Sequence, residues 1–177
     1  SAATTDDDAE VRQLAVEAVA THRGEAAAAP ALALTDDPDP WVRAEAVVAL
    51  DRLDRAAHED VIEAALDDDH HAVRRNAIVS LFKRRGEDAL PVLLGVADDP
   101  SERVREWAAH LLGGVADDHA DEALARLADD DSDIVRKTAV RARDVDPGSF
   151  RRQFSGTLDE SERTLPGEDD LNRNPNL

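Results

Sequence analysis

The densest group of side chains able to hold a metal ion is a run in which Asp67, Asp68 and Asp69 are followed by His70 and His71. Carboxylates and imidazoles both bind zinc. The run lies between two stretches with helical apolar spacing, so we expect it to form a turn in which acidic side chains are simply solvated. We therefore interpret the sequence as having no metal site.

Catalytic arrangements of other kinds are also missing from the sequence. The chain contains no cysteine, which excludes thiol nucleophiles, cysteine-bound zinc and disulfides. No Ser-His-Asp set, glycine-rich phosphate loop or converging pair of carboxylates follows from the spacing of the residues. We therefore expect no catalytic residue and no cofactor, and we favour a protein that is not an enzyme.

A fixed repeat organises the chain. Val-Arg pairs recur every 31 residues, at Val11-Arg12, Val42-Arg43, Val73-Arg74, Val104-Arg105 and Val135-Arg136. Four residues after each Val comes an alanine, at Ala15, Ala46, Ala77, Ala108 and Ala139. Eight residues after it come Val19, Leu50, Leu81 and Leu112, and Arg143 in the last copy. These positions share one face of a helix, so each copy predicts an amphipathic helix in a repeat array.

A second set of helices is predicted between the Val-Arg helices, over Glu25–Leu34, Ala57–Leu66, Glu87–Ala97 and Asp118–Ala128. Gly24 and Gly86, just before two of these segments, stand where a helix would end. Pro30 and Pro91 fall inside this set and predict late starts or bends. The sequence therefore predicts an all-α fold, a right-handed α-solenoid of helix pairs with a period of 31 residues and about nine to ten helices.

The residue three positions before each Val is expected to cap its helix, and these residues are Asp8, Asp39, His70, Ser101 and Ser132. Histidine is the exception among these types, so Asp69 is expected to cap in its place. The array is predicted to span residues 8–155, after a flexible segment 1–7 and before a polar tail 156–177. Phe150 and Phe154 are expected to cover the exposed end of the stack.

The pattern Asp-Asp-Pro-x-x-x-Val-Arg-x-x-Ala-x-x-x-Leu, in residues 36–50 and nearly so in 98–112, resembles the HEAT-like repeat of the phycobilisome-lyase type. The resemblance covers residues 8–155. It implies a structural ladder that ties neighbouring repeats together through a column of arginines and the acidic column before it. The ladder residues so implied are Arg12, Arg43, Arg74, Arg105, Arg136, Asp36, Asp67, Asp98 and Asp129.

The resemblance leaves an enzymatic alternative open. A few members of this family attach bilin chromophores or hydroxylate a protein residue, although most are taken to be adaptors. His58-Glu59 is similar to the His-Glu pairs of the iron-binding hydroxylases, which need several such pairs, and this chain has only one. A lyase-like or chromophore-handling enzyme is therefore the alternative to an adaptor.

The same resemblance implies that the Val-Arg helices line the concave face. Counted from Val, offsets +2, +6, +9 and +10 point away from the buried face, which predicts exposed Val48, Val79 and Phe82 near the centre of a groove. An apolar centre with an arginine-rich rim is typical of protein interfaces. Alternatively, the two valines touch neighbouring helices and Trp107 packs between repeats. The predicted partner-binding residues are Ala44, Val48, Arg52, Arg75, Val79, Phe82, Lys83, Trp107, His110 and Arg141.

The chain is strongly acidic, with 40 Asp and Glu against 21 Lys and Arg and a formal net charge of −19. Abundant Asp and Ala with scarce Lys resemble the composition of proteins from extreme halophiles. At about 1 M salt the Debye length is only about 3 Å. An acidic surface therefore serves the solubility of the protein more than the recognition of a partner. Nucleic acid is not an expected partner, because it requires a basic stripe.

No apolar run approaches the roughly 20 residues that span a membrane, and no charged-then-apolar signal opens the chain, so we expect a cytoplasmic protein. The sequence predicts a non-catalytic scaffold or adaptor, monomer or homodimer, that binds a protein partner in the concave groove. A signalling assembly is one setting for such a protein. A further alternative is self-assembly through the first helix, which has no partner helix before it, or through the tail.

Overall fold

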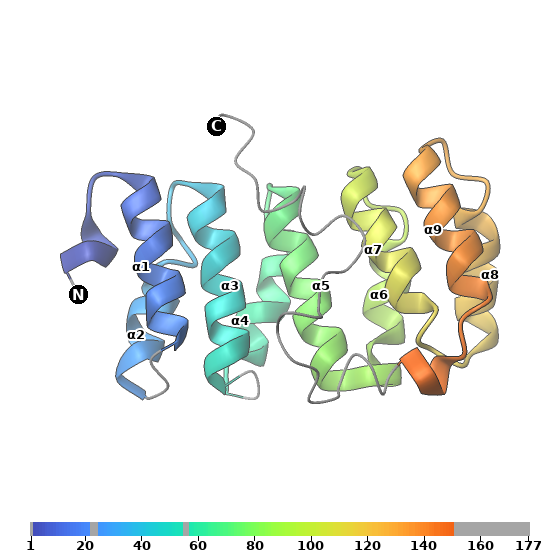
Figure 1. Ribbon diagram of the computed structural model, residues 1–177, viewed down its shortest axis with the longest axis horizontal. Helices are drawn as coiled ribbons and strands as arrows, with labels where there is room; N and C mark the ends of the chain where they lie inside the picture. Colours follow the sequence, from blue (N-terminus) through green and yellow to red (C-terminus); the bar gives the residue numbers. More distant parts are fainter. Residues whose placement is uncertain (1, 22–24, 55–56, 151–177) are drawn as a thin grey trace.

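The structure, a computed structural model, describes residues 2–21, 25–54 and 57–150. Within these ranges all regular secondary structure is helical, with nine α-helices, three short 3-10 helices and a helical turn over residues 147–150, which confirms the predicted fold class. The Val-Arg helices stand side by side as one layer (Figure 1). This Val-Arg layer consists of α1 (Ala9–Thr21), α3 (Pro40–Asp54), α5 (His71–Arg85), α7 (Glu102–Leu112) and α9 (Asp133–Arg143).

The second layer lies behind the first in Figure 1 and is made of shorter helices. It consists of α2 (Glu25–Ala33), α4 (Glu59–Ala64), α6 (Leu90–Val96) and α8 (Asp118–Leu127). The 3-10 helices are η1 (Ala2–Thr5), η2 (Ala65–Asp67) and η3 (Gly86–Ala89). No helix in the described ranges combines the length and the apolar composition needed to cross a membrane.

Turn residues set where the helices begin and end. α5 ends at Gly86, whose φ of 58° lies in the left-handed region that glycine tolerates best. Pro91 lies in the first turn of α6, which begins late, after η3, because proline lacks the N–H that the helix interior requires. Pro30, in contrast, lies inside α2.

The start of α5 corrects one expectation. His70, and not Asp69, is the N-cap of this helix, and its imidazole accepts a hydrogen bond from the backbone N–H of Ala72 at 3.3 Å. An imidazole nitrogen without a proton is an acceptor, so it replaces the usual capping oxygen. Asp69 instead receives a hydrogen bond from Arg43 at 2.6 Å.

The alanine column allows the Val-Arg helices to pack closely against one another. Ala46, Ala77, Ala108 and Ala139 are completely buried where consecutive helices of this layer meet. The apolar core forms two clusters, one in the first half of the array and one in the second, and Leu66 and Val92 pack against both. The solenoid is thus held together by contacts between sequential neighbours.

The ends of the array differ from the sequence expectations. Residues 2–5, within the segment 1–7 that was predicted to be flexible, form η1 against α1, with Thr4 buried. The predicted tail 156–177 and Phe154 lie outside the described residues. Phe150 does not cover the end of the stack, because its ring contacts Phe82 of α5 and His110 of α7.

Candidate partner-binding site

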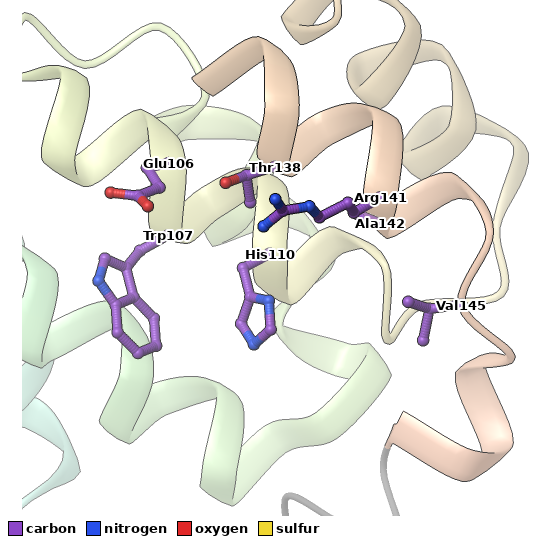
Figure 2. A pocket seen from close by; sticks show the side chains of 7 residues that line it. All are labelled: Glu106, Trp107, His110, Thr138, Arg141, Ala142 and Val145. Atoms are coloured by element: carbon purple, nitrogen blue, oxygen red, sulfur yellow. The ribbon is translucent and has the colours of Figure 1, made fainter. Parts of the chain in front are cut away.

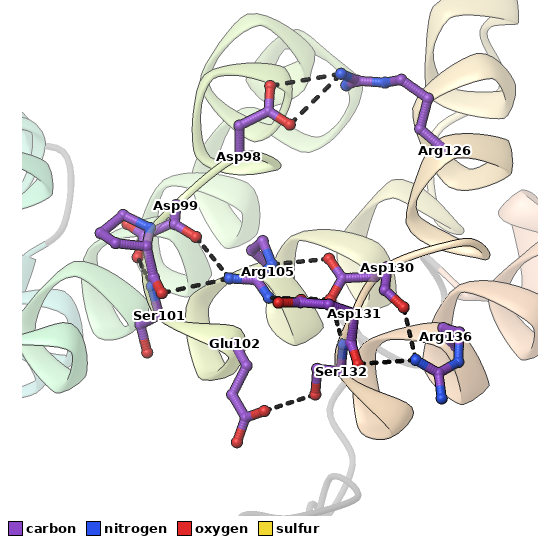
Figure 3. Close-up of polar contacts among 11 residues, drawn as sticks. Asp98, Asp99, Ser101, Glu102, Arg105, Arg126, Asp130, Asp131, Ser132 and Arg136 are labelled. Atoms are coloured by element: carbon purple, nitrogen blue, oxygen red, sulfur yellow. Dashed lines mark hydrogen bonds and ion pairs between the residues drawn. The ribbon is translucent and has the colours of Figure 1, made fainter.

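An arginine ladder joins each repeat to the next (Figure 3). The first four ladder arginines each donate two hydrogen bonds, from Nε and Nη2, to both oxygens of one carboxylate, over distances between 2.7 and 2.9 Å. The pairs are Arg12 with Asp37, Arg43 with Asp68, Arg74 with Asp99 and Arg105 with Asp130. Planar two-point pairing of this kind fixes orientation as well as charge.

The acid of the ladder is therefore the second member of each Asp-Asp pair, and the predicted column of Asp36, Asp67, Asp98 and Asp129 is wrong by one residue. The first aspartate of each pair is exposed, whereas Asp37 and Asp99 are buried. The second aspartate also accepts the backbone N–H of the residue two positions later, as Asp99 does from Ser101 at 2.8 Å. This local hydrogen bond turns its carboxylate inward, toward the arginine of the preceding repeat.

The main chain continues the ladder within each repeat. The carbonyl of each ladder aspartate accepts a hydrogen bond from the arginine six residues later, for example Asp99 from Arg105 at 2.9 Å. Arg136 ends the series among the described residues, with hydrogen bonds to the carbonyls of Asp130 and Asp131. The hydrogen bonds from Arg105 hold the pKa of Asp130 down to about 2, so this acid is ionised at neutral pH.

Four of the predicted partner-binding residues are not exposed. Ala44, Arg75, Phe82 and Trp107 retain between 2% and 6% of their accessible surface, which corrects the expectation that they line an open groove. Ala44 is covered because α5 packs close to α3, and the side-chain amide of Asn76 donates to the Ala44 carbonyl at 2.8 Å.

The burial of Phe82 has a long-range cause. The ring of Phe150, from the turn after α9, meets the Phe82 ring edge-on with centroids 5.9 Å apart. Gly114 allows this approach, since a Cβ atom there would lie 3.0 Å from Phe82 Cζ and would overlap the Phe150 ring. Helical periodicity within α5 cannot reveal a contact that arrives from residue 150.

Arg75 and Trp107 form a contact between α5 and α7. The guanidinium carbon of Arg75 lies 5.7 Å from the centroid of the Trp107 ring, a cation–π geometry. Trp107 thus packs between repeats, as the alternative interpretation of the sequence expected.

The remaining predicted residues reach solvent to different degrees. Arg52 and Arg141 are exposed, while Val48, Val79, Lys83 and His110 are half-buried. Lys83 Nζ lies 3.6 Å from an oxygen of Asp51, which also accepts a hydrogen bond from Ser80 at 2.7 Å. The two valines contribute partly to packing, and Val79 packs against the second core cluster.

A cavity of about 150 Å³ opens between α7 and α9 on the Val-Arg layer (Figure 2). Its walls are mostly apolar, and its lining residues are Glu106, Trp107, His110, Thr138, Arg141, Ala142 and Val145. Three of them were predicted as partner-binding residues. Thr138 was missed although it occupies the same repeat position as Trp107, and Val145 follows α9, where the repeat pattern gives no signal.

Burial sets the charge state of this cavity. It lowers the pKa of His110 to about 4, so the imidazole is neutral at pH 7, and it raises the pKa of Glu106. Within the described residues, Trp107 Nε1 and His110 Nε2 have no hydrogen-bond partner. Two buried polar atoms therefore remain available beside an apolar wall.

The two histidines of the acidic run before α5 pack against an indole ring. Across the described ranges, no cluster of three or more His, Asp or Glu side chains has the arrangement needed to hold an ion. The His70 and His71 rings instead pack against Trp41, with centroids 5.0 and 6.4 Å from the indole.

The repeat pattern and the helix pairs agree with a known repeat family. The family model for HEAT repeats matches residues 1–81 and 59–142. The chain belongs to the HEAT repeat family. The search among curated proteins found no match.

Solved structures share the fold. The complex of CpcE and CpcF of phycocyanin lyase from Nostoc sp. PCC7120 contains a chain that matches with a TM-score of 0.61 and 24% identity, over 80% of this chain and 94% of that one. At this identity the match shows a shared helical-repeat fold. A designed armadillo repeat protein in complex with the peptide (KR)4 matches with a TM-score of 0.52 and 24% identity, over 79% and 77% of the two chains.

Proposed function

We propose that this protein is a non-catalytic scaffold that binds a segment of a partner protein along the Val-Arg layer. A solenoid of stacked repeats offers an extended surface suited to protein binding. The observation that carries the proposal is a set of exposed cations on this layer, in a chain whose net charge is −19. Arg52, Lys137, Arg141 and Arg143 are exposed and form no ion pair with any described residue.

Most other described arginines of this chain, unlike these four cations, form ion pairs with its own carboxylates. The ladder arginines, together with Arg84 and Arg85, are all neutralised by carboxylates of this chain. Acidic residues are about twice as numerous as basic ones, so an exposed cation that forms no ion pair with a described carboxylate is unusual in this chain. Such cations are free to pair with acidic groups of another molecule.

The packing within the two layers also favours the Val-Arg layer as the partner-binding side of the solenoid. Consecutive Val-Arg helices pack closely along the whole array, whereas in the second layer α6 and α8 form the main contact between neighbours. In a curved stack the more closely packed layer is the inner one, so we place the partner on the concave side. Short-range hydrogen bonds to Arg52 and Arg141 would survive molar salt, where long-range attraction is screened within about 3 Å.

Charge reversal tests the proposal. Full-length protein and the Arg52→Glu, Arg141→Glu double variant would be used for affinity capture in molar KCl, with Arg126→Glu on α8 as the matched control. We expect the double variant to recover at least tenfold less partner and the control to recover the wild-type amount. Equal recovery by all three proteins would overturn the proposal.

Self-association is a second candidate, favoured by the first helix. Val11 and Leu14 are 37% and 60% exposed, whereas Val42 and Val73, the counterparts of Val11, are almost completely buried. The outer side of α1 therefore presents an apolar face on which another repeat would fit. Light scattering tests this candidate, since a monomer at every concentration would contradict it and a dimer lost in Leu14→Glu would support it.

A further inference from the structure

We propose that the cavity between α7 and α9 is an anchor pocket for one aromatic side chain within an acidic segment of a partner protein. This inference rests on the proposed function and specifies the chemistry of the partner. The size of the cavity, the nature of its walls and the charge of α9, which borders it, all point to this occupant.

The volume of the cavity fits a single side chain of a partner. Sites for small molecules and cofactors usually measure about 300–1,000 Å³, which is larger than this cavity. A cavity of about 150 Å³ is the size that admits one benzene ring. The pocket therefore fits one phenyl group and is too small for a cofactor.

The walls favour an aromatic occupant. Trp107 and His110 meet edge-on, with ring centroids 5.7 Å apart, and Phe150 meets His110 with centroids 5.0 Å apart. Aromatic rings prefer edge-to-face or offset neighbours, so an incoming ring would extend this group. His110 is neutral at pH 7 and adds no charge that the ring would have to desolvate.

The rim favours an acidic segment. The sequence of α9 contains four cations and one acid, a composition opposite to that of the whole chain. The Arg141 side chain reaches over the cavity in Figure 2. Val145, which lines the cavity, is 37% exposed, so apolar surface continues from the wall of the cavity to solvent. A ring flanked by carboxylates matches this combination of apolar wall and basic rim.

Tryptophan fluorescence reports directly on this pocket. The chain has two tryptophans and no tyrosine, and Trp107 lines the cavity while Trp41 packs against His70 and His71. The full-length protein would be titrated in molar KCl with a capped peptide that carries one Phe between runs of Asp. Matched peptides would replace the Phe by Ala, or every Asp by Ser. A Trp41→Phe variant assigns the signal to Trp107.

We expect a saturable change in Trp107 emission. Replacing Phe by Ala in the peptide should weaken binding by about tenfold or more, as loss of a buried aromatic side chain requires. Arg141→Glu should weaken binding at least fivefold, and Arg126→Glu should leave it unchanged. No saturable change, equal binding of the Ala peptide, or an equal loss in Arg126→Glu would overturn the inference.

The two proposals fail separately. If charge reversal at Arg52 and Arg141 abolishes capture of a partner but the Phe peptide leaves Trp107 unaffected, the anchor pocket is wrong and the scaffold stands. Alternatively, the peptide could occupy the pocket while the double variant still captures its partner normally. In that case the anchor pocket stands, and the proposal that a partner binds along the Val-Arg layer is wrong.

Discussion

At the scale of single residues, the second aspartate of each Asp-Asp pair makes the connection between repeats. Asp99 accepts two hydrogen bonds from Arg74 and one from the N–H of Ser101, while its neighbour Asp98 is exposed and lies 3.4 Å from Arg126. The two acids are adjacent in sequence but differ in burial. Their energetic contributions should differ accordingly.

We therefore predict that Asp99→Ala lowers the free energy of unfolding by about 3 kcal/mol, because it leaves a mostly buried arginine without its partner. Asp98→Ala, which removes an exposed ion pair, should change it by about 0.5 kcal/mol or less. Urea denaturation of both variants provides the measurement. Similar losses in the two variants would show that the ladder does not depend on the second acid.

His110 makes stability depend on pH. Burial lowers its pKa to about 4 in the folded protein, against about 6.5 for an unperturbed histidine, so the unfolded chain binds more protons between these values. Stability from this group is complete above pH 6.5 and is lost as the pH falls toward 4. Buried Glu106, whose pKa is raised by burial, acts in the opposite direction.

Comparison with a variant isolates the histidine. Between pH 7 and 5, the wild type should lose about 2 kcal/mol more of its unfolding free energy than His110→Asn does, by the linkage between pKa and stability. Denaturation curves at several pH values measure the difference. The same pH dependence in both proteins would contradict the burial of a neutral imidazole.

At the scale of elements, the residues after α9 complete the second half of the core. Phe150 packs on Phe82, and this contact requires the absence of a side chain at Gly114. Gly95, in contrast, is exposed within α6 and has open space where a Cβ atom would lie. Packing therefore requires glycine at position 114, whereas position 95 has room for a side chain.

Gly114→Ala should destabilise the protein by about 1–3 kcal/mol, since the added methyl group overpacks the contact between the two rings. Gly95→Ala should stabilise it by about 0.5–1 kcal/mol, because alanine is the better helix former. Thermal unfolding followed by circular dichroism compares them. A neutral Gly114→Ala would mean that Phe150 is not fixed over this glycine.

The sequence predicts the helices themselves, because their pattern is local, but it does not predict the contacts that distant residues make between them. The period of 31 residues and the Val, Ala and Leu columns were enough to predict the helix pairs, since this pattern is local. Two adjacent aspartates look alike in sequence, so only the structure shows that Asp99 and not Asp98 faces Arg74. The burial of Phe82 depends on Phe150, at a separation that helical periodicity does not reach.

At the scale of the whole molecule, the net charge of −19 sets the response to salt. Self-repulsion destabilises a compact anionic chain, and screening reduces it. The ladder pairs are largely buried and are screened less than exposed charges, so added salt should remove more repulsion than attraction.

Raising KCl from about 0.1 M to about 2 M should therefore increase the midpoint of thermal unfolding by several degrees, in keeping with the marginal stability of domains this size. Calorimetry over a series of KCl concentrations measures the trend, and a matched series in a neutral osmolyte separates screening from exclusion effects. A midpoint that falls with added salt would show that exposed ion pairs stabilise this chain more than repulsion destabilises it.

Photo-crosslinking tests most directly whether the Val-Arg layer binds a partner. The photoreactive amino acid benzoylphenylalanine would replace Arg52, Arg141 or, on the second layer, Arg126, and each full-length protein would be irradiated with partner present in molar KCl. The account predicts crosslinks to the same protein from positions 52 and 141 and none from position 126. Crosslinks from position 126 alone, or a captured partner that crosslinks from neither Val-Arg position, would contradict it.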